Sequence, residues 1–364
     1  MELTIGDFAR ATGLSAKALR RYDDLGLLRP DRVDPYSGYR YYADAQTDRA
    51  RLIAWLRRIG MPLADVGRVC ALHERDPGEA ARAIRAYWAS VEAETAARRG
   101  LAASLAERVE GNGNDMTDGP SYVLAGAALL DRGLVRELQQ DAVHLAPRLL
   151  VVADGYGPEG ERAARAAVEA VAAVAGEAAA VATPPGRGPS PRRAGDGLNA
   201  LEEAFRAAGA AVAGLDGSGT TLTAALLAGT RLVVSHVGDA RAHLLRDGRL
   251  RQLTRDDTVV QALVDAGELG PREAAARPDR ALLLKALDGG GAVPEPSLTV
   301  HELSPGDRVL LCTDGLSAVV PPTETAPALA AGTPEEAAEA LLALARAQGA
   351  PDNLALAVGD LTVT

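Results

Sequence analysis

Four aspartates of the sequence stand beside short apolar runs, where a buried strand would begin or end. They are Asp154, Asp239, Asp314 and Asp352. An Asp beside a Gly usually marks only a turn. Carboxylates at the ends of core strands can also converge on one edge of a sheet sandwich, where their mutual repulsion favours bound cations. Because every ligand would be an oxygen atom, the pattern favours Mg²⁺ or Mn²⁺ over zinc.

A second group of residues, near the N-terminus, has the spacing of a DNA-binding motif. Residues 4–22 predict a helix–turn–helix, because Gly13 separates two capped helical stretches. The second stretch would carry three basic side chains towards a groove or towards phosphates: Lys17, Arg20 and Arg21. Residues 34–42 (DPYSGYRYY) predict a turn and a short strand, a wing from which Arg40 would reach DNA.

Charge and composition narrow the class of protein. The net charge is −10, but residues 1–60 carry 11 Lys and Arg against 8 Asp and Glu. Such a basic head can approach a polyanion, whereas the acidic remainder would repel one or hold cations. No apolar run reaches membrane length and the start does not resemble a signal peptide, so we expect a cytoplasmic protein without a membrane partner. Its two cysteines, Cys70 and Cys312, are then expected to be reduced core thiols.

The elements that must position these groups fall into successive segments of the 364 residues. The sequence predicts an all-α winged helix-turn-helix domain at residues 1–75, one long helix at 76–110, a polar linker at 111–120 and a further domain at 121–364. The long helix has a partial apolar seam, which fits a dimerisation helix or a helix packed on its own domain. From residue 121 onward, short apolar strands are interspersed with helices, and this pattern predicts an α+β domain.

The N-terminal segments LSAKALRRYDDLGLLRP, GYRYY and RIGMPLADV resemble, in their order, the MerR family of regulators. The resemblance covers residues 2–75 and places the following helix in the family's dimerisation position. It implies a homodimer on pseudo-palindromic promoter DNA and leaves RNA polymerase open as a further partner. The implied DNA contacts are Lys17, Arg20, Arg21, Tyr22 and Arg40. The family's paired tyrosine is Tyr22-Asp23 here, so the sequence departs from the pattern at one expected phosphate contact.

Six later segments resemble the metal-dependent PPM-type (protein phosphatase 2C-like) serine/threonine phosphatases of bacteria. They are GLVRELQQDAV, VVADGYG, GTTLTAALLAGTRL, HVGDARAHLLRDGRLRQLTRDDT, PGDRVLLCTDGLS and APDN, and they span about 124–361. The resemblance implies an α-β-β-α sandwich within the α+β class. It also implies hydrolysis of phosphoserine and phosphothreonine on a phosphoprotein substrate by a metal-activated water.

The same resemblance implies a set of residues that bind Mn²⁺ or Mg²⁺ ions. Asp154 would bridge two ions, and the carbonyl of Gly155 would add an oxygen. Asp314 and Asp352 would complete the coordination of one ion, and Asp239 with Asp314 would hold a third ion that binds more weakly.

Two further residues have implied catalytic roles. Arg136 would grip the phosphate as a planar fork, and Asp141 would orient metal-bound water. Residues 257–280 would form a flap beside the cleft. The sequence departs from the family at Gln139-Gln140, which replaces Asn-Glu, and at residues 155–158 (GYGP), which replace GMGG. Either change would slow turnover or narrow the substrate range.

Two functions remain open on the sequence alone. The first is a DNA-binding transcriptional regulator that carries an active phosphatase domain. The second is a MerR-type transcription factor whose phosphatase-like domain is a non-catalytic sensor of a ligand or metal. The retained acidic residues favour the enzyme, because clustered buried carboxylates are costly to a mere scaffold.

Overall fold

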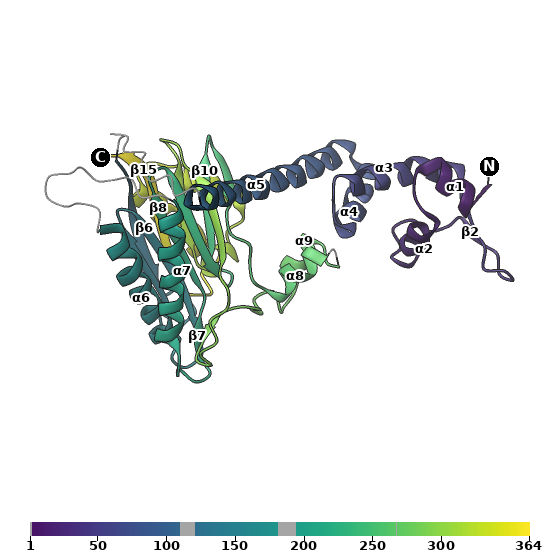
Figure 1. Ribbon diagram of the computed structural model, residues 1–364. Helices are drawn as coiled ribbons and strands as arrows, with labels where there is room; N and C mark the ends of the chain where they lie inside the picture. Colours follow the sequence, from purple (N-terminus) through teal and green to yellow (C-terminus); the bar gives the residue numbers. More distant parts are fainter. Residues whose placement is uncertain (1, 110–120, 181–193, 267) are drawn as a thin grey trace. The chain divides into compact units, whose positions relative to one another are not determined.

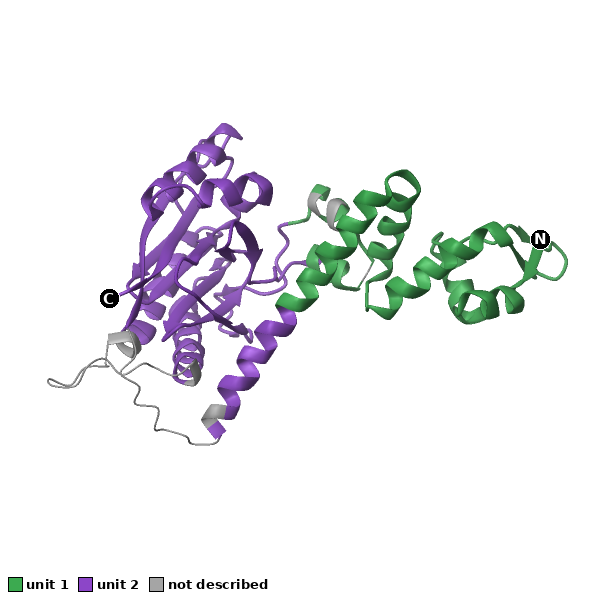
Figure 2. Cartoon of the chain, turned by 90° about the horizontal axis from the view of Figure 1, so that it is seen from above, with its two compact units in different colours: residues 1–93, 260–280 green, residues 94–259, 281–364 purple. Residues whose placement is uncertain are grey.

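The computed structural model describes residues 2–109, 121–180, 194–266 and 268–364. The predicted linker at 111–120 lies outside these ranges. The chain divides into two compact units (Figure 2): unit 1 comprises residues 1–93 with 260–280, and unit 2 comprises 94–259 with 281–364.

Unit 1 begins with the elements of the predicted helix-turn-helix and wing. In chain order they are β1 (Glu2–Thr4), α1 (Ile5–Thr12), α2 (Ala16–Asp24), β2 (Arg32–Val33), β3 (Arg40–Ala43), α3 (Thr47–Arg58) and α4 (Leu63–Arg75). The hydroxyls of Thr4 and Ser15 cap α1 and α2 by accepting hydrogen bonds from backbone N–H groups. Gly13 ends α1 in the left-handed conformation that glycine adopts without strain.

The core of unit 1 is small and joins the helices to the wing. β3 pairs with both β1 and β2, so this largely helical domain also contains a three-stranded antiparallel sheet. Phe8 of α1 stacks on Tyr42 of β3 with ring centroids 4.6 Å apart, and both side chains are buried. Cys70 of α4 is a free thiol within the same core.

One long helix, α5 (Pro77–Val109), follows, as the sequence predicts. The side chain of Asp76 accepts hydrogen bonds from the N–H groups of Gly78 and Glu79, which fixes the first turn. The boundary between the two units falls inside α5, at residues 93 and 94. The expected flap contains α8 (Val259–Ala266) and α9 (Pro271–Ala276), which form a small apolar cluster of their own.

Unit 2 is built on two antiparallel sheets. The first has the strand order β11-β10-β14-β15-β4 and the second β12-β7-β6-β8-β9-β13, with β5 also paired to β6. The strands are β4 (Tyr122–Asp131), β5 (Asp141–Ala146), β6 (Leu149–Tyr156), β7 (Gly219–Thr220), β8 (Leu222–Ala228), β9 (Arg231–Val237), β10 (Arg241–Arg246), β11 (Arg249–Gln252), β12 (Leu287–Asp288), β13 (Ser297–Glu302), β14 (Arg308–Cys312) and β15 (Leu354–Val363).

Helices cover the outer face of each sheet, which confirms the predicted α-β-β-α sandwich. On the second sheet lie α6 (Gly160–Ala180) and α7 (Ala194–Val212), side by side in Figure 1. On the first lie α11 (Pro322–Leu329) and α12 (Pro334–Ala347), near the short α10 (Asp314–Ser317). A third apolar cluster fills the space between the sheets. The buried runs are nearly continuous because each sheet is covered on both faces. None of the described helices combines the length and apolar character needed to cross a membrane.

Candidate active site

Strand ends from both sheets meet at one edge of the sandwich. β5 begins at Asp141 and β6 ends just beyond Asp154, and these two residues face each other in the antiparallel register. β9 ends before Asp239, β14 ends before Asp314, and β15 begins after Asp352. Since neighbouring strands run antiparallel, the end of one and the start of the next lie at the same edge.

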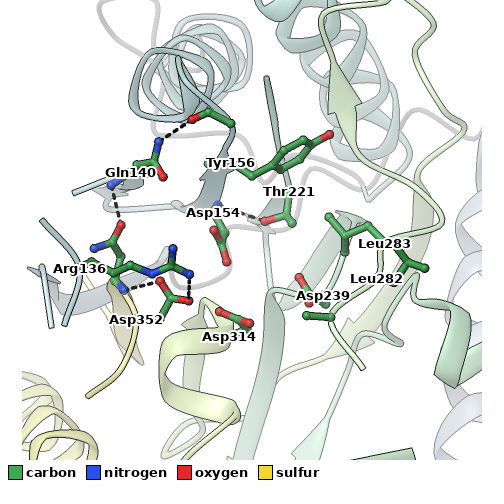
Figure 3. A pocket seen from close by; sticks show the side chains of 14 residues that line it. Arg136, Gln140, Asp154, Tyr156, Thr221, Asp239, Leu282, Leu283, Asp314 and Asp352 are labelled. Atoms are coloured by element: carbon green, nitrogen blue, oxygen red, sulfur yellow. Dashed lines mark hydrogen bonds and ion pairs between the residues drawn. The ribbon is translucent and has the colours of Figure 1, made fainter. Parts of the chain in front are cut away.

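These strand ends surround a cavity of about 460 Å³ (Figure 3). Its lining contains each of the predicted metal ligands, namely Asp154, Gly155, Asp239, Asp314 and Asp352, together with Arg136. Asp141 is not in the lining but lies buried behind it, 6% exposed. The structure therefore brings together all the residues that the sequence predicted for the chemistry.

Burial and mutual repulsion raise the pKa values of Asp141, Asp154, Asp239 and Asp314. Burial and the charge of Asp141 raise the pKa of Asp154 well above its usual range. Burial raises the pKa of Asp141 to about 7, although the hydroxyl of Thr313 donates to its carboxylate at 2.7 Å and opposes the shift. Burial and the charge of Asp314 raise the pKa of Asp239 to about 7. The pKa of Asp314 is raised by burial and by Asp352.

Arg136 is the one cation among the residues lining this described cavity. Its guanidinium donates to the carboxylate of Asp352 at 2.6 Å, and this ion pair is half exposed on the Arg136 side (Figure 3). The pKa of Arg136 is raised by that hydrogen bond. One arginine cannot balance four nearby carboxylates, so the site keeps an excess of negative charge.

The donor set fits divalent cations. Several carboxylates line one cavity. Burial and the charges of neighbouring aspartates raise the pKa values of Asp154 and Asp239, and bound cations would relieve that repulsion. Within the described residues, no three Asp, Glu, His or Cys side chains are gathered closely enough to form a metal-binding group. Asp352 is paired with Arg136, so a cation bound by Asp352 would compete with this ion pair.

Several residues that position the site were not singled out by the sequence. The hydroxyl of Thr221 accepts from the N–H of Asp154 at 3.1 Å, and Thr313 donates to Asp141. The side chain of Asn353 accepts from the N–H of Gln140 and donates to the carbonyls of Arg132 and Leu138. Each of these contacts joins segments far apart in the chain, so no local spacing announces it.

The departures from the family pattern lie at this cavity. Gln140 lines it and donates through its amide to the carbonyl of Gly157, while the side chain of Gln139 accepts from the N–H of Asp141. Tyr156 also lines the cavity and is 38% exposed. A Cβ at Gly155 would collide with the carbonyls of Gly160 and Gln140, so this position requires glycine. Leu282 and Leu283, which follow directly after the expected flap, lie across the cavity from Arg136 (Figure 3).

The predicted DNA contacts of unit 1 differ in how far their side chains are exposed and paired. Lys17, Arg20 and Arg21 are exposed on α2. Arg40 lies on β3 with its guanidinium donating to Asp23 at 2.7 Å. Tyr22 differs from the expectation: only 6% exposed, it packs in the core of the domain, because it falls on the inner face of α2 beside Leu19.

Comparison with known families agrees with both halves of the chain. Residues 3–72 match the model of the MerR HTH family regulatory protein, and residues 126–355 match that of protein phosphatase 2C. The chain is 43% identical over 250 residues to the serine/threonine protein phosphatase PstP of Mycobacterium tuberculosis. That match covers 66% of this chain and 46% of PstP, so the chain spans about half the length of this curated relative.

Solved structures show the same likeness. The catalytic domain of PstP in complex with two manganese ions has a TM-score of 0.57 and 40% identity, covering 66% of this chain and 100% of that one. The PPM phosphatase MsPP from Mycobacterium smegmatis, in complex with cacodylate, has a TM-score of 0.57 and 33% identity, covering 66% and 100%. The edge of the sandwich, its aspartates and these matches lead to one conclusion: the chain belongs to the protein phosphatase 2C family, whose members are metal-dependent, and carries a MerR-type domain at its N-terminus.

Proposed function

We propose that the chain is a DNA-binding regulator with an active, metal-dependent phosphatase domain that hydrolyses phosphoserine and phosphothreonine in proteins. The observation that carries the proposal is the cavity at the sandwich edge, where four aspartates and Arg136 share one lining. Membership of the protein phosphatase 2C family supports the reaction.

Each of the cavity's main residues has a role that follows from its position. Arg136, half exposed at the mouth, releases Asp352 and receives the phosphate of the substrate in its planar fork. Asp154, on the central strand β6, holds the middle of the ligand set, and the hydroxyl of Thr221 fixes its backbone. Asp141, held by Thr313, is placed to orient water behind Asp154.

Mn²⁺ or Mg²⁺ is the proposed cofactor. The carboxylates of Asp154, Asp314 and Asp352, with the carbonyl of Gly155, would hold two ions, and Asp239 with Asp314 a third, weaker one. When bound, such ions supply Lewis acidity and neutralise the clustered carboxylates. Manganese in the related PstP structure supports this choice.

Asp154→Asn tests the enzyme proposal. We expect loss of Mn²⁺-dependent hydrolysis of a phosphothreonine peptide, while the chain stays folded, because one of several repelling carboxylates has been removed. Removing such an electrostatic element costs about 3 kcal/mol or more of transition-state stabilisation. Asp216→Asn, at an exposed site outside the cavity, is the matched control and should keep full activity.

A wild-type rate no higher than that of Asp154→Asn would contradict the enzyme proposal. A shift in DNA affinity on adding Mn²⁺ would then favour a second function, a transcription factor whose phosphatase-like domain senses a metal. The observation that favours this alternative is the ion pair of Asp352 with Arg136, which occupies one of the proposed metal ligands.

Binding of promoter DNA by unit 1 is the second half of the proposal. Lys17, Arg20 and Arg21 are exposed on one helix and meet the demand for phosphate contacts, and a pseudo-palindromic site would suit a homodimer. RNA polymerase is a natural further partner of a promoter-bound regulator. A DNA-binding head and buried thiols also support a location in the reducing cytoplasm.

Arg20→Ala should weaken promoter binding and flatten the salt dependence by about one unit of slope, because one phosphate contact is lost. Arg162→Ala, which removes an exposed arginine of α6 in unit 2, is the control. Fluorescence anisotropy across a salt series measures both. Equal slopes for wild type and Arg20→Ala would contradict the assignment.

A further inference from the structure

Unit 2 contains a second cavity, of about 330 Å³, between the last part of α5 and the strands β9, β10, β11 and β13. We call it the arginine pocket, because four arginines contribute to its lining: Arg99, Arg231, Arg246 and Arg251. One of them comes from α5 and the others from three different strands. Glu302 is the one acidic residue among the lining residues that the structure describes.

Two of the four arginines already have partners. Arg231 pairs with Glu302 at 3.3 Å. Arg246 donates from Nε to Asp307 at 2.7 Å, and its second nitrogen donates to the carbonyl of Glu302 at 2.8 Å. The nearby acidic side chains are therefore occupied, and they leave no carboxylate for the rest of the pocket.

Arg99 and Arg251 have no ion-pair partner among the described residues. Arg251 is half buried, and its pKa is lowered by burial and by the charge of Arg246. The neighbouring His301 does not add charge, because burial and Arg251 lower its pKa to about 4. A guanidinium withdrawn from water beside another cation is unfavourable unless an anion accompanies it.

Shape limits what that anion can be. The cavity is concave, its volume falls in the range of small-ligand sites, and α5 forms one wall through small residues, Ala96, Gly100 and Ala103. A rigid duplex would contact the exposed rim rather than this interior. Guanidinium groups offer paired, planar donors, which match the oxygens of phosphate groups.

We propose that the arginine pocket binds a small phosphate-bearing anion with two or more negative charges. Arg251 and Arg99 supply the free donors, and Arg246 and Arg231 are held in place beside them by Asp307 and Glu302. Because the ligand would contact both α5 and the strands, it would strengthen the attachment of this helix to the phosphatase domain. The site is separate from the catalytic cavity, with which it shares no lining residue.

Calorimetric titration of the full chain with pyrophosphate, in EDTA, tests the proposal without any readout of hydrolysis. We expect saturable binding that persists in Arg136→Ala, since that change removes the phosphate-binding arginine of the other cavity. Arg251→Gln should weaken binding about tenfold or more, the loss expected for a hydrogen bond to a charged group. It should not harm folding, because it removes a half-buried cation without an ion-pair partner.

Arg249→Gln is the matched control: Arg249 is exposed on the same strand, two residues away, and outside this lining. We expect it to change the affinity by less than about twofold, as for an uninvolved surface charge. Unaltered binding in Arg251→Gln, or an equal loss in Arg249→Gln, would overturn the site. Citrate serves as a carboxylate probe, and binding as tight as that of pyrophosphate would overturn the phosphate class. A titration that never saturates would also refute the proposal.

Discussion

The side chain of Asn353 shows how much of the catalytic cavity depends on a single buried amide. It is 5% exposed, and its three hydrogen bonds join the start of β15 to the segment that carries Arg136. Two carbonyls face its nitrogen and one N–H faces its oxygen, so an aspartate of the same shape would place a carboxylate against two acceptors. The orientation of Arg136 therefore depends on a neutral side chain beside Asp352.

Two buried histidines of unit 2 reduce its stability at low pH. Burial and the charge of Arg241 lower the pKa of His243 to about 4, and burial with Arg251 lowers that of His301 to about 4. The unfolded chain binds these protons at higher pH than the folded one. The stability that each neutral histidine contributes is therefore fully present above about pH 6.5 and is lost as the pH falls towards 4.

We expect His243→Leu to reduce this loss. A histidine with that shift contributes about 2 kcal/mol to the fall in unfolding free energy between pH 7 and pH 5. Among the described residues Nδ1 of His243 has no hydrogen-bond partner. Leucine therefore removes the titrating group without breaking a hydrogen bond of this atom. Urea unfolding of the unit 2 transition at both pH values measures the change. His73→Leu, at an exposed site of unit 1, is the control, and an unchanged pH dependence in His243→Leu would contradict the assignment.

At the scale of elements, the last part of α5 is seated closely against β13. Gly100 lies where a Cβ would come within 2.6 Å of the carbonyl oxygen of Val300, Ala97 is 7% exposed, and Ser104 is 1% exposed. Leu101 packs against the apolar cluster of the second sheet. Small residues on one side of the helix permit this close approach, and β13 is an edge strand that the helix covers.

Gly100→Ala should loosen this contact even though alanine favours helix. The backbone of Val300 would have to shift, and we expect the amides of residues 96–106 to exchange hydrogen about tenfold faster, for a loss of about 1.4 kcal/mol. Gly176→Ala on α6 has open space around its Cβ and should instead stabilise the chain by about 0.5–1 kcal/mol. Equal exchange in Gly100→Ala and wild type would show that the contact is loose.

The elements themselves follow largely from local sequence, because caps and apolar runs are local. Asp76 predicts the start of α5, and Gly13 predicts the end of α1. The convergence of Asp154 and Asp314 follows from the placement of carboxylates at strand ends. The hydrogen bond from Thr313 to Asp141 and the contact of Gly100 with Val300 depend on packing between distant segments, which local spacing does not encode. The burial of Tyr22, by contrast, follows the spacing of α2, because Tyr22 lies one turn after Leu19 on the inner face of the helix.

At the scale of the whole molecule, α5 begins in unit 1 and ends in unit 2. Only part of its predicted apolar seam is buried within the chain. Ile84 packs against the core of unit 1, while Trp88, Leu105 and Val109 remain exposed. Exposed apolar side chains at helical spacing suit a second copy of the same helix. Dimerisation through residues 76–110 therefore remains our prediction.

Trp88→Glu should convert the dimer to a monomer at micromolar concentration, because a charge would enter the apolar seam. Light scattering of the full chain measures the mass. Ala86→Glu places the same charge at an exposed position of the same helix, away from the seam, and should leave the dimer intact. A wild-type chain that is already monomeric would contradict the prediction, as would a dimer that survives the change at Trp88.

Each unit contains one buried cysteine, whose reaction with an alkylating reagent would report the unfolding of that unit. Cys70 lies in the core of unit 1 and Cys312 in that of unit 2, and both are buried. Burial raises the pKa of Cys70 and raises that of Cys312 to about 12, so neither thiol is reactive in the folded chain. Brief exposure to iodoacetamide during denaturation would therefore label a cysteine only after its own unit has opened. Mass spectrometry of the two peptides would follow the unfolding of the MerR-type domain and of the phosphatase domain separately in one sample, without any further label.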